Sequence, residues 1–245
     1  MEYKDALFRF EIADQLLGFL DTDLTGKVLL DIGCGSGNML LAAIHKNAKE
    51  CIGVDIDLKD LGDNHFSEIA RQYNIDITNI RIYEVRIENI NFSDNSFDII
   101  TLIDSIEHMD NPEIILKEIS RLLKPGGFFL LNVSPLYYSP LGHHLFIYFP
   151  KQEYPWVHLY KNFNDLIKEK NVEAWYLDHL QGLNKITSAK ILDYSKKCGL
   201  KLLKCQTVEV GREIFSQFNE KIDPGLMPPS IDDLFIESNT ILFTK

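Results

Sequence analysis

Apolar residues follow two spacings along the first half of the chain. Continuous apolar runs, which are typical of strands buried in a sheet, occur at 27–33, 51–55, 80–85, 97–104 and 128–134. Apolar residues recur every three or four positions, as in helices, at 5–20, 36–46, 58–73 and 113–123. Strands and helices therefore alternate, which predicts a mostly parallel sheet with helices on both faces.

The alternation changes in the last part of the chain. A helical segment at 187–198 precedes a strand at 200–210, and a final strand follows at 234–244. No crossover helix separates these two strands, so we expect an antiparallel pair at the sheet edge. The whole pattern predicts a single α/β domain over 1–245, with a doubly wound, seven-stranded, mostly parallel sheet and an antiparallel edge strand.

A glycine-rich turn joins the first strand to the first helix. Gly33, Gly35 and Gly37 alternate directly after the apolar run that contains Asp31. Glycine lets the backbone approach a ligand closely, and the first N–H groups of the following helix have no partner within the helix. This arrangement is typical of a nucleotide site. A dinucleotide fingerprint needs Gly or Ala where this chain has Asn38, which disfavours a nicotinamide-dependent oxidoreductase.

Asp55 ends the second strand and stands 18 residues after Gly37. An acidic residue about 20 positions after such a turn accepts hydrogen bonds from the hydroxyl groups of an adenosine ribose. The alternative role is to cap the helix that begins near Leu58, and Asp57 suits that role better. We therefore predict that Asp55 binds a ribose.

Further motifs follow the glycine turn in a fixed order. They are FDII at 97–100, EHMDNP at 107–112 and RLLKPGG at 121–127. Together with D-x-G-x-G-x-G at 31–37, this series resembles the class I S-adenosylmethionine-dependent methyltransferases, in particular their type 11-like group. The resemblance covers roughly residues 27–134. It implies a Rossmann-like methyltransferase fold, S-adenosylmethionine as the cofactor and methyl transfer as the activity.

The resemblance also implies which residues hold the cofactor. Asp31 would interact with the amino end of S-adenosylmethionine or with the loop around it, and Asp104 would lie where the methionine portion passes. The full predicted set of cofactor-binding residues is Asp31, Gly33, Gly35, Gly37, Asp55, Ile56, Arg86, Ile87, Ile103 and Asp104.

The chain departs from the family near Arg86, where the family has an acidic residue that binds the adenine amino group. Arginine has no acceptor for an amine. Adenine must therefore depend on the Ile87 backbone and apolar packing, or on Glu88 reached by a shifted turn.

His108 is the predicted general base. The methyl donor is already activated, so the protein must align the acceptor and remove its proton. An unperturbed histidine pKa near 6.5 leaves neutral imidazole available at pH 7. Glu107, the preceding residue, is predicted as the second catalytic residue. The alternative role for His108 is to shape the wall of the acceptor pocket without moving a proton.

A metal-dependent alternative uses the same loop. On a helical turn, Asp104, Glu107 and His108 would share one face, and one of His143, His144 or His158 could complete a site. The pattern is similar to methyltransferases in which a divalent cation orients the acceptor oxygens. Such ligands suit Mg²⁺ or Mn²⁺ better than zinc. Cofactor and substrate contacts without a metal are the favoured prediction.

Residues 135–180 form a predicted insertion after the fifth strand. They are rich in aromatic residues and histidines, and four prolines oppose long regular elements. Long irregular insertions in compact domains are usually functional lids or flexible segments. The chain therefore divides into a cofactor-binding half (1–134), this insertion and the C-terminal part of the sheet (181–245). The predicted substrate-binding residues are Tyr137, Tyr138, His143, His144 and Trp156. The alternative is that these aromatic rings only anchor the loop to the body.

Composition limits the partners. A formal net charge of −11 argues against binding to a nucleic-acid backbone. No apolar stretch approaches the roughly 20 residues that span a bilayer, and the first residues do not resemble a signal peptide. The cysteines at 34, 51, 198 and 205 are scattered, so we expect buried thiols in the cytoplasm.

The predicted partner is a small-molecule methyl acceptor, with oxygen favoured over nitrogen as the methylated atom. The alternative outside enzymes is a catalytically inactive S-adenosylmethionine-binding regulator or scaffold protein. The identity of the acceptor and the oligomeric state stay open.

Overall fold

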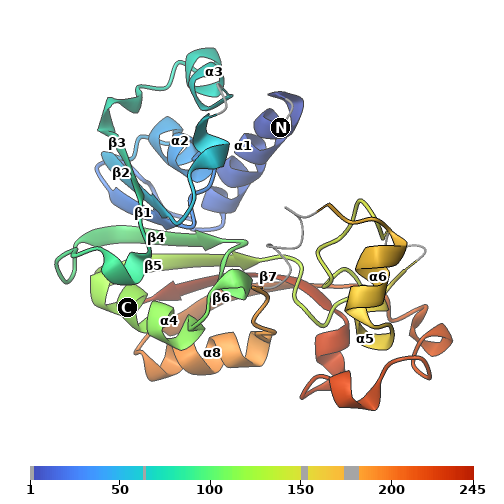
Figure 1. Cartoon of the computed structure of the whole chain (residues 1–245). Helices are drawn as coiled ribbons and strands as arrows, with labels where there is room; N and C mark the ends of the chain where they lie inside the picture. Colours follow the sequence, from blue (N-terminus) through green and yellow to red (C-terminus); the bar gives the residue numbers. More distant parts are fainter. Residues whose placement is uncertain (1–2, 63–64, 150–153, 174–181) are drawn as a thin grey trace.

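A computed structural model describes residues 3–62, 65–149, 154–173 and 182–245 (Figure 1). Its centre is a seven-stranded sheet with the strand order β3-β2-β1-β4-β5-β7-β6. The strands are β1 (Val28–Ile32), β2 (Glu50–Asp55), β3 (Ile80–Glu84), β4 (Phe97–Ile103), β5 (Leu123–Val133), β6 (Lys201–Glu209) and β7 (Ile236–Thr244). Pairs among β1 to β5 are parallel, whereas β7 runs antiparallel to both β5 and β6. The predicted fold class is confirmed, and the antiparallel strand lies one place inside the edge.

Helices cover both faces of the sheet. Figure 1 shows α1 (Tyr3–Gly18), α2 (Asn38–His45) and α3 (His65–Gln72) on one face, and α4 (Pro112–Leu122) and α8 (Ser188–Lys197) on the other. The short helices α5 (Val157–Tyr160) and α6 (Phe163–Glu169) lie beyond one end of the sheet. The 3₁₀ turns are η1 (Lys59–Gly62), η2 (Ile77–Asn79), η3 (Ile87–Asn89), η4 (Ile106–His108), η5 (Phe215–Gln217), η6 (Pro224–Leu226) and η7 (Ile231–Leu234). None of the helices in the described ranges is long and apolar enough to cross a membrane.

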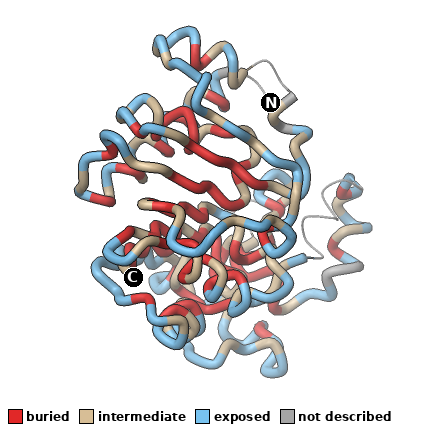
Figure 2. The backbone as a smooth tube through the Cα atoms, turned by 90° about the vertical axis from the view of Figure 1, so that its left-hand side faces the viewer, coloured by how far each residue is buried: buried red, intermediate tan, exposed pale blue. Residues whose placement is uncertain are grey.

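Two hydrophobic cores arise because successive strand residues point to opposite faces. Leu29 and Ile99 pack with α1 and α2, whereas the following residues Leu30 and Ile100 pack with α4. Both faces of the central strands are therefore buried, which explains their continuous apolar runs. Figure 2 shows the same strands as the main buried part of the backbone.

The predicted element boundaries agree with the structure, with two exceptions in the first half. The predicted helix at 58–73 consists of η1 and the shorter helix α3. The fifth strand begins at Leu123, directly after α4, because Leu123 pairs with Phe97 across a β-bulge. Cys34 and Cys51 are buried as expected, but Cys205 is exposed on the edge strand β6, so the prediction of buried thiols is wrong there.

The insertion packs against a segment from the end of the chain. Trp156 and Leu159 form a cluster with Leu234 and Phe235, and the rings of residues 215 and 218 pack against it. Figure 1 places this unit beyond the sheet, at the end where β5 leads into the insertion. Residues 150–153 and 174–180 of the predicted insertion lie outside the described residues. The division of the chain into three parts stays a prediction.

Candidate functional site

The glycine turn between β1 and α2 has the backbone conformation that its glycines permit. Gly33, Gly35 and Gly37 have φ angles of +71°, +46° and +78°, in the left-handed region. A Cβ atom at Gly33 would lie 2.3 Å from Ser105 Oγ, and one at Gly37 would lie 2.7 Å from the Phe66 ring. A Cβ atom at Gly35 would meet nothing within 4 Å. The backbone at Gly35 therefore has an open side that a ligand can approach.

Asp31 lies beneath this turn and is almost fully buried, with an exposed fraction of 3%. Thr101 stands opposite it on β4 and donates a hydrogen bond from Oγ1 to Asp31 Oδ1 at 2.6 Å. Burial raises the pKa of Asp31 to about 7, and the charge of Asp55 raises it further against the effect of the Thr101 hydrogen bond. A nearby positive charge would stabilise the ionised form of this buried carboxyl group.

Asp55 connects the end of β2 to the glycine turn. Its Oδ2 accepts a hydrogen bond from the Gly35 N–H at 2.7 Å, and its Oδ1 accepts one from the Asp57 N–H at 3.1 Å. A carboxylate has about four lone-pair sites, so Asp55 retains capacity for ligand hydroxyl groups. The next residue, Ile56, is 63% exposed beside this carboxylate, which is unusual for an isoleucine.

Arg86 and Ile87 follow β3 and face different environments. The Arg86 side chain is exposed and forms an ion pair with Asp110, with 3.5 Å between Nη1 and Oδ2. Ile87 is buried, with 4% of its surface exposed. The guanidinium of Arg86 is therefore already paired with the loop after β4, and its predicted contact with the cofactor stays a prediction.

The loop after β4 carries the predicted catalytic residues. Asp104 has a φ angle of +45° and is exposed at the end of β4. Local desolvation raises the pKa of its carboxyl group to about 6, against the opposing effects of the Ser134 N–H and of Arg9 on α1. Ile103, the last residue of β4, is half-buried next to it.

Glu107 and His108 belong to the 3₁₀ turn η4 and differ in their surroundings. Glu107 is 2% exposed, and neither carboxyl oxygen has a hydrogen-bond partner among the described residues. Burial, and to a lesser degree the charge of Asp104, raises the pKa of Glu107 well above its usual value. Burial therefore favours the neutral form of the Glu107 carboxyl group. The half-buried His108 ring contacts the His144 ring, with 5.3 Å between their centroids.

The insertion brings some of the predicted substrate-binding residues together. The rings of Tyr137 and Tyr138 are 5.2 Å apart, and the Tyr137 ring contacts His158 at 5.0 Å. His143 is fully buried, and its Nδ1 accepts a hydrogen bond from the Leu145 N–H at 3.0 Å. His144 is the member of this group that reaches the η4 turn.

Trp156 lies in the interior of the insertion. It has no exposed surface, and its Nε1–H donates to the Leu234 carbonyl at 2.9 Å. These contacts are those of a packing residue. They agree with the alternative that aromatic rings of the insertion anchor the loop to the body of the protein. Binding of an acceptor by Trp156 stays a prediction.

The structure does not assemble the metal-dependent alternative. No group of three or more His, Cys, Asp or Glu side chains within the described ranges is arranged to hold a metal ion. A divalent cation therefore has no support from the geometry of Asp104, Glu107 and His108.

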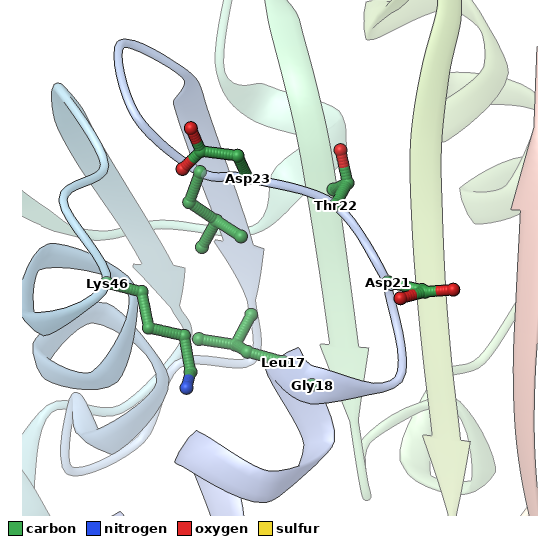
Figure 3. A pocket seen from close by; sticks show the side chains of 7 residues that line it. Leu17, Gly18, Asp21, Thr22, Asp23 and Lys46 are labelled. Atoms are coloured by element: carbon green, nitrogen blue, oxygen red, sulfur yellow. The ribbon is translucent and has the colours of Figure 1, made fainter.

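A surface pocket of about 410 Å³ lies near the amino ends of β1 and β2, away from the glycine turn at the carboxyl end of β1 (Figure 3). It is formed by the end of α1, the turn that follows it and Lys46 after α2. Two of its charged groups have partners, since Lys46 Nζ lies 2.9 Å from Asp14 and Asp23 accepts hydrogen bonds from Thr25. None of the predicted site residues lines it. This pocket is separate from the candidate site.

Comparisons with known proteins show what the part of the chain that carries this site is similar to. Residues 30–131 match the family model described as "Methyltransferase domain". The solved structure of an S-adenosylmethionine-dependent methyltransferase from Listeria monocytogenes, described as putative, shares the fold, with a TM-score of 0.60 and 17% identity, covering 96% of this chain and 99% of the other. Residues 30–131 are therefore similar to a methyltransferase domain, and the fold of the chain is that of solved S-adenosylmethionine-dependent methyltransferases.

Two other solved structures show how widely this fold is used. Magnesium protoporphyrin IX methyltransferase from Synechocystis, solved with bound SAH, has a TM-score of 0.59 and 13% identity over 97% of this chain and 83% of its own. A protein described as the [4+2]-cyclase SpnF has a TM-score of 0.60 and 18% identity over 96% of this chain and 80% of its own. These likenesses concern the fold alone, because fold does not fix the reaction.

Curated relatives of the methyltransferase domain carry the name ubiquinone biosynthesis O-methyltransferase. One from Neisseria meningitidis is 28% identical over 151 residues, which is 57% of this chain and 61% of the relative. One from Coxiella burnetii is 36% identical over 107 residues, which is 42% of each chain. The match thus spans less than two thirds of these relatives.

Sequence reasoning missed three residues that shape the candidate site. Thr101 holds Asp31, Ser105 packs against Gly33, and Arg9 acts on the charge of Asp104. Thr101 could have been found as the polar residue in the middle of the apolar run at 99–103. Arg9 and Ser105 reach the site through the packing of distant segments, which no local pattern reveals.

Proposed function

We propose that this chain transfers a methyl group from S-adenosylmethionine to a hydroxyl oxygen of a small molecule. The observation that carries the proposal is the open side of the Gly35 backbone beside the Asp55 carboxylate, within a methyltransferase domain. Relatives named O-methyltransferases support oxygen as the acceptor atom. We also propose a cytoplasmic location, which the free cysteines of the described chain support.

The residues present fit each part of the donor. Asp55 has lone pairs left for the ribose hydroxyl groups, and Gly35 leaves space next to it. The buried carboxyl group of Asp31 suits the ammonium group of the methionine portion. Exposed Ile56 and the Ile87 backbone are the proposed neighbours of the adenine ring.

When bound, S-adenosylmethionine supplies an electrophilic methyl group on a sulfonium. The protein then has to orient the acceptor, exclude water and receive a proton. We assign the proton to His108, because it lies on the η4 turn after β4 and is half-buried. Burial favours the neutral Glu107 carboxyl group, which can donate a hydrogen bond, so its proposed role is to orient a group and not to act as a base.

The acceptor is proposed to lie between the η4 turn and the insertion. Tyr137, Tyr138 and His144 are the proposed wall on the insertion side, and His108 lies opposite. The buried His143 contacts the ring of His158 at 5.7 Å, behind this wall. Aromatic rings of this kind suit a flat acceptor, because ring pairs gain from edge-to-face and offset contacts.

The second candidate is a donor-binding protein without transferase activity. The observation in its favour is the ion pair of Arg86 with Asp110, at the place where the family binds adenine through an acidic residue. The two candidates share donor binding and differ in turnover.

Calorimetry with S-adenosylmethionine and its demethylated product tests the shared part. Asp55→Ala should weaken binding by about 1.5–3 kcal/mol, the scale of hydrogen bonds to a charged group. Asp57→Ala is the matched control, because Asp57 is exposed and pairs with Lys59. Binding that both variants leave unchanged contradicts the proposed donor site.

Labelled donor with metabolite extracts then tests turnover. Transfer of label to small molecules by the wild-type protein, and its loss in Asp55→Ala at a subsaturating donor concentration, supports the transferase. Tight donor binding without label transfer to any extract favours the second candidate.

A further inference from the structure

Asn184 ties the segment before α8 to the η4 turn. Its backbone N–H donates a hydrogen bond to the Glu107 carbonyl at 2.9 Å. Its side-chain Nδ2 donates to the Ile106 carbonyl at 2.6 Å and to the Met109 carbonyl at 2.7 Å, across 78 and 75 positions of sequence. One residue therefore makes three hydrogen bonds to the backbone of the turn that carries Glu107 and His108.

The side-chain amide of Asn184 matches its neighbours in only one orientation. Its Oδ1 accepts a hydrogen bond from the Ile186 N–H at 2.9 Å, while Nδ2 faces the two carbonyl groups of the turn. A carbonyl only accepts and a backbone N–H only donates, so this position needs both a donor and an acceptor on one planar group. Asparagine supplies both, whereas an ionised aspartate supplies acceptors alone.

The hydrogen bonds within η4 explain why the turn benefits from an outside donor. The His108 N–H donates to the Ser105 carbonyl at 3.0 Å, and the Met109 N–H donates to the Ile106 carbonyl at 3.3 Å. Neither bond uses the carbonyl groups of Glu107 and Met109, which accept from Asn184. Backbone carbonyl groups away from water need such partners, so Asn184 stabilises the turn where the turn's own bonds do not.

The connecting segment, residues 184–187, is itself anchored. Ile186 is 3% exposed and belongs to the hydrophobic core on the α4 side of the sheet. Thr187 is also buried, and its hydroxyl group caps the amino end of α8. Lys185 reaches the insertion, where its Nζ lies 5.0 Å from the centroid of the Tyr137 ring. The connecting segment therefore joins the fixed core to the η4 turn and to the proposed wall of the acceptor site.

We propose that Asn184 is a positioning residue, which fixes where the η4 turn presents Glu107 and His108 to the acceptor. The inference rests on the proposed function. The hydrogen bonds of Asn184 described here go to η4 and to Ile186, and none of them involves Asp55 or the glycine turn, where the donor is proposed to bind. Loss of these bonds should therefore slow methyl transfer and leave donor affinity unchanged.

The first test needs neither donor nor acceptor. Asn184→Asp keeps the size of the side chain and an acceptor for the Ile186 N–H, but it replaces the donating nitrogen by a second oxygen. Exchange of the His108 and Met109 amide hydrogens is followed by NMR in wild type and variant. We expect exchange to be roughly 10-fold faster or more in the variant, because two hydrogen bonds to the turn are lost. Wild-type exchange rates in Asn184→Asp overturn the proposal.

Thr187→Ala is the matched control, because it removes the cap of α8 from the same connecting segment. It should lower the free energy of unfolding in urea and leave amide exchange in η4 within about twofold of the wild type. If it speeds exchange in η4 as much as Asn184→Asp does, Asn184 acts only through overall stability and the proposal is overturned. Should Asn184→Asp fail to fold, Asn184→Ala takes its place, because it removes the same donor without adding a charge.

The second test uses catechol as the acceptor probe with labelled S-adenosylmethionine. Asn184→Asp should lower the maximal rate roughly 10-fold or more, with the donor Kd from calorimetry within about twofold of the wild type. Thr187→Ala should keep both values. A wild-type rate in Asn184→Asp, or a loss of donor affinity as large as the loss of rate, overturns the proposal. Absence of transfer by the wild type counts against the proposed function with this probe, and amide exchange then decides whether Asn184 holds the turn.

Discussion

Ionisation of Asp31 is expected to make the ligand-free protein less stable as the pH rises. The pKa of this buried carboxyl group is raised from 3.8 to about 7. Between these values the folded protein binds a proton that the unfolded chain has lost, so stability falls as the pH increases toward 7. The shift of about 3 units sets an upper limit of about 4 kcal/mol on the loss.

Asp31→Asn tests this reasoning directly. Asparagine keeps the shape of the side chain, and its carbonyl oxygen can still accept the hydrogen bond from Thr101. Unfolding in urea would be measured at pH 5 and pH 8.5 for wild type and variant. Integrating the linkage relation, we expect the stability of the variant relative to the wild type to increase by about 3 kcal/mol between these pH values.

Asp98→Asn is a matched control with the opposite expected sign. Partial burial would raise the pKa of Asp98, but hydrogen bonds from Lys124 and the Val28 N–H outweigh it and lower the pKa. Its neutralisation should therefore cost stability at pH 8.5. A stability difference between Asp31→Asn and wild type that is the same at both pH values would refute the assigned pKa of Asp31.

Calorimetry at pH 8.5 should also show weaker donor binding by Asp31→Asn, since the charge opposite the donor ammonium is lost.

Three further predictions concern catalysis, packing and acid stability. His108→Ala should lower the maximal rate of methyl transfer roughly 10²–10⁴-fold with donor affinity nearly unchanged, and an unaltered rate would move His108 to the pocket wall. Trp156→Ala should lower the free energy of unfolding by about 3–5 kcal/mol in urea, because it empties the centre of an aromatic cluster, whereas donor binding should persist. The free energy of unfolding should fall as the pH drops from 6.5 toward 3. His143 and His158 have pKa values of about 3 in the folded protein, so both histidines bind protons when the chain unfolds at these pH values. Replacement of both histidines by Gln should make the free energy of unfolding less dependent on pH in this range.

Local patterns predicted the parallel half of the fold well. The run at 27–33 and the glycines after it were sufficient to predict β1, the turn and α2, because strand, turn and helix are adjacent in the sequence. The start of β5 at Leu123 was not predictable in the same way. Lys124 to Gly127 has the composition of a turn, and only the pairing of Leu123 with Phe97 on β4 makes it part of the sheet.

The positions of the candidate site residues were predictable where they lie at or near the end of a strand, and not where they depend on the packing of distant segments. Asp31, Asp55 and Asp104 follow from their positions at or near strand ends. The contact of His108 with His144 depends on how the insertion folds back, and the burial of Trp156 depends on partners near the end of the chain. Residue type and spacing could only predict that these side chains belonged to the acceptor region.

The packing of the insertion on residues 211–235 has a consequence for synthesis on the ribosome. The glycine turn and its neighbouring strands involve residues up to 134, so they can begin to fold while the chain is still being made. Trp156 instead waits for Phe215, Phe218 and Phe235, which emerge much later. We therefore expect the strands around the glycine turn to fold first in the nascent chain. The aromatic surface of the insertion should stay exposed until the last strand is complete, and a chaperone would be needed during that interval.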